Sequence, residues 1–222
     1  MAEGTYWIGI GDVHDDIKAL DRIPGLGDAA GVVVSGDLTI RGGAASAKLV
    51  IEAVRRRNPV VMAQIGNMDT GAVDAYLTAE GVNLHATGRV MPQGVGFFGC
   101  GWSTPTPFHT PSEAGEERIA AWLEAAHAVV AHCPHLVMVC HTPPFGTAAD
   151  VVGSGAHVGS QVVREFILRV QPAVCLTGHI HEARSVDTLG RTAIVNPGAL
   201  ADGGYARITL GPDGLAASLL TV

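Results

Sequence analysis

Short apolar runs alternate with helical segments through most of the chain. The runs are rich in Val and Ile, and several end in Gly followed by a polar residue. This order is typical of parallel strands joined by helical crossovers. The predicted strands are 6–10, 31–35, 60–65, 95–100, 136–140 and 173–176, and the predicted helices are 15–22, 44–57, 70–80, 112–130 and 161–170.

The pattern changes after residue 182, where short apolar runs follow one another with tight turns between them. This spacing favours antiparallel strands over 183–186, 191–195, 205–210 and 215–221. Two stretches are predicted to be irregular: 101–111, which holds three prolines, and the glycine-rich 146–159. Because no linker or repeat interrupts the chain, we expect one domain over residues 1–222 that contains two sheets.

Composition and charge limit the classes of protein that fit. Hydrophobic residues make up 47% of the 222 residues, which is enough for a sizeable core, and the net charge is −7. An acidic surface disfavours long nucleic acid, because phosphate contacts need Lys and Arg. A small phosphorylated ligand remains compatible if bound cations reverse the local sign. With neither a signal-like N-terminus nor a long apolar run, we expect a cytoplasmic protein without a membrane partner.

The chain has four cysteines, and none of them forms a CxxC pair. Buried reduced thiols are the favoured interpretation, and a disulfide or a cysteine metal site is the alternative. The cysteines are Cys100, Cys133, Cys140 and Cys175.

Polar residues of the types that bind metals follow the predicted strands. Carboxyl ends of parallel strands meet at one edge of a sheet, where ligands bind. On an extended segment, residues i and i+2 point the same way, so Asp12 and His14 are expected to share an ion. Carboxylate, amide and imidazole donors suit Mn, Fe, Zn or Mg, and the lack of thiolates argues against structural zinc. The candidates are Asp12, His14, Asp37, Asn67, His141, His179 and His181.

Six segments, in chain order, resemble the motifs of the calcineurin-like metallophosphoesterases. They are GDVHDD, SGDL, GNMD, CHTPPFGT, LTGHIHE and NPG, and the resemblance covers residues 5 to about 210. The HTPP segment, the glycine-rich loop after it and the NPG resemble a subgroup of small phosphoesterase-like proteins. The resemblance implies an α/β fold, a four-layer αββα sandwich of two mixed β-sheets flanked by helices.

The same resemblance implies how the seven candidates divide between two divalent metal ions. One ion would bind Asp12, His14 and His181, the other would bind Asn67, His141 and His179, and Asp37 would bridge both. Manganese is the first choice of metal, with iron, zinc and magnesium as alternatives. The ions would activate a bridging water against a small phosphodiester or phosphomonoester, with Asp37, Asn67 and His141 as the catalytic set.

Met68 departs from the family pattern. Many members have a histidine after the metal-binding asparagine, and this histidine assists the phosphate or protonates the leaving group. A thioether does neither at useful strength, and loss of a general acid slows a reaction roughly 10²–10⁴-fold. We therefore expect slow hydrolysis, most simply by a phosphodiesterase, that favours good leaving groups such as aryl phosphates, or else acid help from elsewhere in the chain. The alternatives are a metal-bearing scaffold and, less favoured by the acidic balance, a nuclease.

Four further residues are candidates for substrate contact, because they lie in or beside segments that would reach over the site. They are Arg41, His109, Asp150 and His157, and for each the alternative is an ordinary surface or loop residue. The Asn196-Pro197-Gly198 segment is expected to form a tight turn near the metals. The sequence leaves the substrate, the native metals and the question of a homo-oligomer open.

Overall fold

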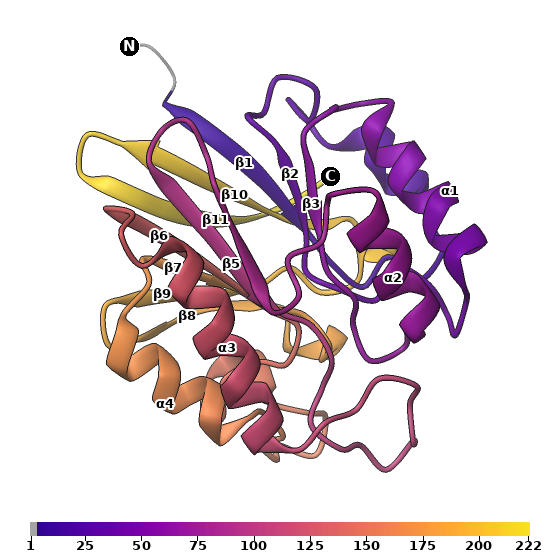
Figure 1. Ribbon diagram of the computed structural model, residues 1–222, viewed down its shortest axis with the longest axis vertical. Helices are drawn as coiled ribbons and strands as arrows, with labels where there is room; N and C mark the ends of the chain where they lie inside the picture. The colour runs from indigo at the N-terminus through magenta and orange to yellow at the C-terminus, as the bar shows by residue number, and fades with distance from the viewer. Residues whose placement is uncertain (1–3) are drawn as a thin grey trace.

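Two β-sheets pack face to face, and helices cover their outer faces, in the computed structural model, which describes residues 4–222 (Figure 1). One sheet has five strands in the order β11-β10-β1-β2-β3, and the other has six in the order β4-β5-β6-β7-β9-β8. Both sheets mix parallel and antiparallel pairs. This arrangement confirms the predicted four-layer αββα sandwich.

The five-stranded sheet is built mainly from the first third of the chain. Its strands β1, β2 and β3 are parallel, and β10 and β11 add an antiparallel hairpin beside β1. The helices α1 and α2 cover its outer face (Figure 1). The bounds are β1 Thr5–Ile10, β2 Val32–Val34, α1 Ala44–Arg55, β3 Val61–Ala63, α2 Gly71–Ala79, β10 Gly204–Gly211 and β11 Gly214–Thr221, with a 3-10 turn at Lys18–Arg22.

The six-stranded sheet follows in the chain and is covered by α3 and α4. Its central strands β5, β6, β7 and β9 are parallel, whereas the edge strands β4 and β8 are antiparallel to their neighbours. The bounds are β4 Thr87–Val90, β5 Val95–Cys100, α3 Glu116–Val130, β6 His135–Cys140, α4 Gln161–Val170, β7 Val174–Leu176, β8 Ser185–Leu189 and β9 Thr192–Asn196. Shorter 3-10 turns lie at Ala148–Asp150, His181–Ala183 and Leu200–Asp202.

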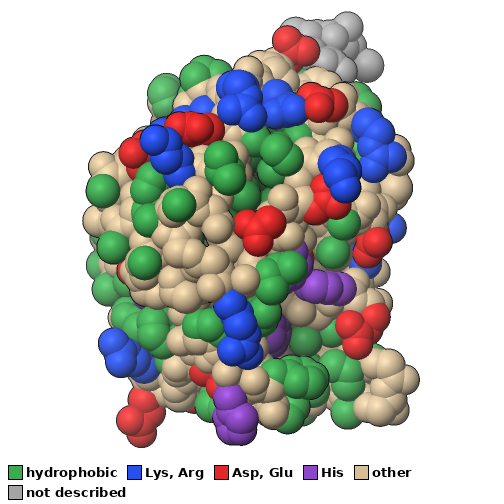
Figure 2. Space-filling model, turned by 90° about the vertical axis from the view of Figure 1, so that its right-hand side faces the viewer, with side chains coloured by type: hydrophobic (Ala, Val, Ile, Leu, Met, Phe, Trp, Pro, Cys, Tyr) green, Lys and Arg blue, Asp and Glu red, His purple; other side chains and the backbone are tan. Residues whose placement is uncertain are grey.

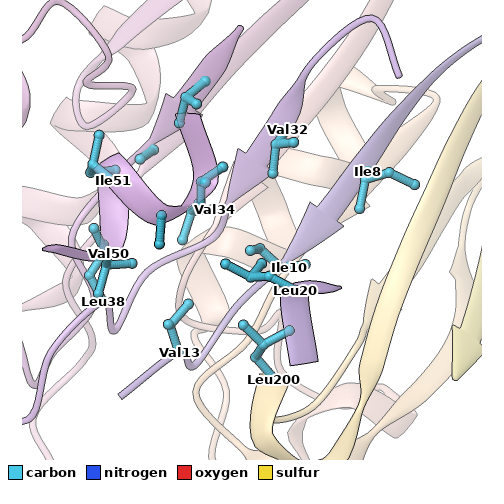
Figure 3. Close-up of a cluster of buried hydrophobic side chains, with 14 of the residues drawn as sticks. Ile8, Ile10, Val13, Leu20, Val32, Val34, Leu38, Val50, Ile51 and Leu200 are labelled. Atoms are coloured by element: carbon cyan, nitrogen blue, oxygen red, sulfur yellow. The ribbon is translucent and has the colours of Figure 1, made fainter. Parts of the chain in front are cut away.

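Alternation along β1 shows how one strand serves two cores. Ile8 and Ile10 point toward the helices and pack with Val34 and Ile51 (Figure 3). Trp7 points the other way, into the apolar layer between the two sheets. Successive side chains on a strand lie on opposite faces, so a strand buried on both faces must be apolar throughout. The inter-sheet layer joins both halves of the chain and fixes their strand ends relative to each other.

Four features of the fold differ from the sequence prediction. The helix predicted over 15–22 is a 3-10 turn at Lys18–Arg22, because Asp15 has φ 63° and accepts a hydrogen bond from Ile40 N at 3.0 Å. The helix α3 begins at Glu116 rather than at 112, because the Ser112 hydroxyl donates to the carbonyl of Asp69 at 2.6 Å. The late strands are not all antiparallel, since β9 pairs parallel with β7. The edge strand β4 was not predicted.

The cysteines and the apolar character of the helices were also considered in the sequence analysis. All four cysteines are buried and free, as predicted for reduced thiols. Across residues 4–222, none of the helices has both the length and the apolar character that crossing a bilayer requires.

Candidate active site

The carboxyl ends of the parallel strands in both sheets lead into one cluster of polar side chains. From the five-stranded sheet, the loops after β1, β2 and β3 supply Asp12, His14, Asp37 and Asn67. From the six-stranded sheet, the loops after β6 and β7 supply His141, His179 and His181. The structure therefore brings together all seven residues that the sequence singled out.

One half of the cluster contains Asp12, His14 and His181. Nε2 of His14 lies 3.1 Å from Nε2 of His181, which lies 3.2 Å from Oδ1 of Asp12. Nε2 of His14 and Oδ1 of Asp12 are 4.0 Å apart. The donor atoms of these three residues thus face a common point, as three ligands of one ion would.

The other half is centred on the side-chain oxygen of Asn67. This oxygen lies 2.7 Å from Nδ1 of His179 and 2.9 Å from Nε2 of His141. Oδ2 of Asp37 stands between the halves, 3.7 Å from Nε2 of His14 and 3.5 Å from Nε2 of His141. This is the placement that a bridging carboxylate requires.

The distances within the cluster fit a pair of divalent cations. Nitrogen and oxygen ligands bind such ions at about 2.0–2.2 Å, so two adjacent ligands of one ion are about 3 Å apart. Most of the donor distances above lie close to that value. Asp12 and Asp37 are also buried, and buried carboxylates are paired or bind metals. The residues present therefore fit two cations with mixed oxygen and nitrogen ligands.

Electrostatics at the cluster favour positive charge. Burial lowers the pKa of His141, but the carboxylate of Asp37 raises it by more, so that the resulting pKa is about 9. Burial raises the pKa of Asp37, yet His141 and His14 bring it below the ordinary value. Burial and the charge of His141 lower the pKa of His179 to about 4, so its imidazole is neutral and able to act as a ligand.

Backbone conformation, rather than strand alternation, aims the ligands. Asp12, His14, Asp37 and His179 have φ between 47° and 71°, in the left-handed region that non-glycine residues rarely adopt. The assumption that Asp12 and His14 lie on an extended segment is therefore wrong. The sharp turns point their side chains toward the cluster, and such strain persists where surrounding structure enforces it.

Glycines before the ligands allow the loops to approach each other. A Cβ on Gly66 would lie 2.1 Å from Oδ1 of Asp37, and one on Gly178 would lie 2.6 Å from Oδ2 of Asp12. Neither distance is possible for a real side chain. The Gly-Asn and Gly-His pairs noticed in the sequence are thus explained by crowding between ligand loops.

Asp69 holds two ligand loops together, a role that the sequence did not reveal. Its buried carboxylate accepts hydrogen bonds from Leu38 N, from both N and Oγ1 of Thr39, and from Gly66 N, at 2.8–3.0 Å. Burial and the charge of Asp37 raise the pKa of Asp69 to about 6. The residue thereby fixes the loops that carry Asp37 and Asn67.

Asn196 has a similar role in the six-stranded sheet. Its side-chain amide donates to the carbonyl of Ile180 at 2.8 Å, between the two histidines of the H-x-H segment. Its side-chain oxygen accepts a hydrogen bond from Gly198 N at 2.9 Å, which closes the expected tight turn. The NPG segment therefore supports the loop of His179 and His181 from behind.

A cavity of about 780 Å³ opens beside the cluster. Its lining includes His14, Asp37, Asn67, His179 and His181 together with the loops around Phe108 and Val158. Hydrophobic side chains border exposed histidines on the face shown in Figure 2. This volume is within the range of small-molecule sites.

The four predicted substrate contacts are not equivalent. Arg41 lines the cavity, and its guanidinium donates to the carbonyl of Phe108 at 3.5 Å. Asp150 is fully buried, and accepts from the backbone N of Gly146, Thr147 and Gly159 and pairs with His157 at 2.7 Å. Asp150 therefore organises the 146–159 loop. Because it is buried and does not line the cavity, its prediction as a substrate contact is corrected to a structural role.

His157 and His109 are also absent from the lining of the cavity. Nδ1 of His157 lies 2.7 Å from the buried carboxylate of Asp150, and its ring lies 5.6 Å from that of Phe145. His109 is exposed, at the tip of the proline-rich loop beside Phe108. The structure therefore leaves Arg41 as the one predicted contact that faces the cavity.

Fold and site together define an α/β-sandwich hydrolase of the metal-dependent type. Residues 127–214 match the family described as metallophosphoesterase, calcineurin superfamily. Over 197 residues the chain is 34% identical to the uncharacterized protein MJ1162 of Methanocaldococcus jannaschii, and the match covers 86% of each chain. The chain belongs to the calcineurin-like metallophosphoesterase family, and it is a metal-dependent phosphoesterase.

Solved structures share the fold at low sequence identity. TT1561 of Thermus thermophilus superposes with a TM-score of 0.75 at 18% identity, over 97% of this chain and 98% of that one. A dimetal phosphatase from Danio rerio superposes with a TM-score of 0.56 at 14% identity, over 99% of both chains. These likenesses support the architecture, while the activity of this chain must be argued from its own residues.

Proposed function

We propose that this protein hydrolyses a small phosphodiester or phosphomonoester, with two divalent cations held by the seven clustered residues. When bound, the cations would lower the pKa of a water between them and neutralise phosphate charge. The convergence of the donor atoms around Oδ2 of Asp37 is the observation that carries this proposal. Manganese is the metal to test first, with iron, zinc and magnesium as alternatives.

The position of each residue in the site determines its proposed role. Asp12, His14 and His181 would hold one ion, Asn67, His141 and His179 would hold the other, and Asp37 would contribute to both. Arg41 lines the same cavity, and its guanidinium would bind a phosphate oxygen. Asp69 and Asn196 keep the ligand loops in place, as second-sphere groups do in metal sites.

Met68 is the reason to expect a modest rate. Its side chain lines the cavity directly after Asn67, and its backbone N–H donates to Oδ1 of Asp37 at 2.8 Å. A proton donor at this position would reach a leaving group, whereas a thioether would not protonate one. Esters of acidic alcohols, such as nitrophenols, need no such help and should be hydrolysed best.

The test is hydrolysis of bis-p-nitrophenyl phosphate with added Mn²⁺. We expect turnover that chelator abolishes and that Asp37→Asn lowers about 100-fold or more, since the ions would lose their shared carboxylate. Absence of turnover with Mn²⁺, Fe²⁺, Zn²⁺ and Mg²⁺, although two ions are bound, would instead support the scaffold alternative. Met68→His tests the missing acid: phosphomonoesterase activity should rise, and an unchanged rate would remove that explanation.

A further inference from the structure

Much of the cavity lining beside the candidate metal ligands is apolar. This apolar wall is formed by Phe108 of the proline-rich loop, Val152 and Val158 of the glycine-rich loop, Ile180, and Met68. Phe108 is 76% exposed and Val158 is 41% exposed, although both are large hydrophobic residues. Exposed apolar side chains that gather around a concave site indicate binding of an apolar group.

Two of the three threonine hydroxyls that line the cavity are already engaged. The hydroxyls of Thr106 and Thr110 both donate to Glu113 at 2.6 Å. Among the lining residues within 4–222, the charged groups outside the ligand cluster are Arg41 and Glu182. Few groups are thus left to bind the hydroxyls of a sugar or the edges of a nucleobase, which a polar substrate would require.

We propose that the cavity binds phosphate esters of hydrophobic alcohols or phenols, with the apolar group against Met68, Phe108 and Val158. The inference rests on the proposed function, because the phosphate would be held at the metal ligands. It also gives Met68 a positive role: the thioether adapts to irregular apolar surfaces and packs well against aromatic rings. The position that commonly supplies an acid in the family here contributes to the binding wall.

The experiment uses diesters that share p-nitrophenol as the leaving group and differ in the second ester group. Methyl, butyl and hexyl esters form the alkyl series, the phenyl ester tests an aromatic group, and the thymidine 5′-ester tests a nucleoside. A fully buried methylene is worth about fourfold in binding. Because this cavity is partly open, we expect kcat/KM to rise about two- to fourfold per methylene, and the thymidine ester to fall below the hexyl ester.

Variants locate the effect. In the double variant Phe108→Ser, Val158→Ser, the rise in kcat/KM per methylene should fall toward onefold, which means no dependence on chain length. Val129→Ser is the matched control, since Val129 is 45% exposed on α3 and does not line the cavity, and it should keep the wild-type rise. A rise that persists in the double variant, a flat series in the wild type, or a preference for the thymidine ester would each overturn the proposal.

Binding of the corresponding alkylphosphonic acids, measured by calorimetry, separates this inference from the proposed function. If no ester is hydrolysed but affinity still rises with chain length, the hydrolytic proposal fails and the apolar site stands. If esters are hydrolysed but neither kcat/KM nor affinity depends on chain length, the hydrolytic proposal stands and the apolar site is refuted.

Discussion

Replacement of Asp69 by alanine should lower the stability of the fold around the site, although Asp69 is not one of the candidate metal ligands. The carboxylate of Asp69 accepts four hydrogen bonds, three of them from backbone N–H groups of Leu38, Thr39 and Gly66. All of these groups are buried, so solvent does not reach them in the native fold. The variant would leave three buried backbone donors without an acceptor, while the Thr39 hydroxyl can rotate to another partner.

The expected loss in the free energy of unfolding follows from the number of unpaired backbone donors. A buried donor left unpaired costs about 1–3 kcal/mol, so three donors give an upper range of about 3–9 kcal/mol. Water that enters the space of the lost carboxylate would satisfy part of the need. We therefore expect the free energy of unfolding to fall by about 3–5 kcal/mol, the range seen when one partner of a buried charged network is removed.

Urea unfolding at pH 8 in the presence of chelator is the appropriate assay, because the pKa of Asp69 is about 6 and its carboxylate is then ionised. Asp202→Ala is the control, because the Asp202 side chain is exposed on the Leu200–Asp202 turn and accepts none of these hydrogen bonds. It should cost less than about 0.5 kcal/mol in chelator. Equal stability of Asp69→Ala and the wild type would refute the role assigned to Asp69.

Three further outcomes are expected. Asn196→Ala leaves the carbonyl of Ile180 without its donor, so affinity for Mn²⁺ measured by calorimetry should fall about 10–100-fold. Burial raises the pKa of Glu113, but threonine hydroxyls bring it to about 2, below the usual 4.5. Its carboxylate therefore stabilises the fold above pH 4.5, and thermal unfolding of wild type should approach that of Glu113→Gln as pH falls toward 2. Gly66→Ala should abolish metal binding, since its Cβ would lie 2.1 Å from a ligand oxygen, whereas Gly71→Ala has open space and should bind normally; equal affinities would contradict this account.

The seven candidate ligands could be grouped from sequence because their signals are local. Each follows an apolar run, and consecutive parallel strands must end at the same edge of a sheet. Asp37 after 31–35 and Asn67 after 60–65 therefore had to be neighbours once the crossovers were recognised. The helix over 161–170 was also predicted with its observed bounds, and in the structure Ser160 caps its start and one apolar face is buried.

The supporting residues could not be found in the same way, because their partners are distant in the chain. Asp69 binds loops about thirty residues away, and Asn196 reaches Ile180 from another strand. Asp150 carried the same chemical signal as a catalytic carboxylate, and only its burial among loop N–H groups showed that it is structural. The edge strand β4 is short and half-buried, so it lacks the apolar run by which the others were recognised.

The site depends on the alignment of the two sheets, because four ligands come from one sheet and three from the other. Gln64 links them directly: its buried side-chain amide donates to the carbonyl of Ser35 at 3.2 Å and to that of Cys100 at 3.0 Å. Ser35 and Cys100 lie at the carboxyl-terminal ends of β2 and β5, in different sheets. A shift of about 1 Å between the sheets would therefore separate Asp37 from His141 as well as break these bonds, and such displacements are enough to disable a catalytic site. The apolar inter-sheet layer and this polar link consequently serve function as much as stability, since they set the distance across which a bridging carboxylate must act.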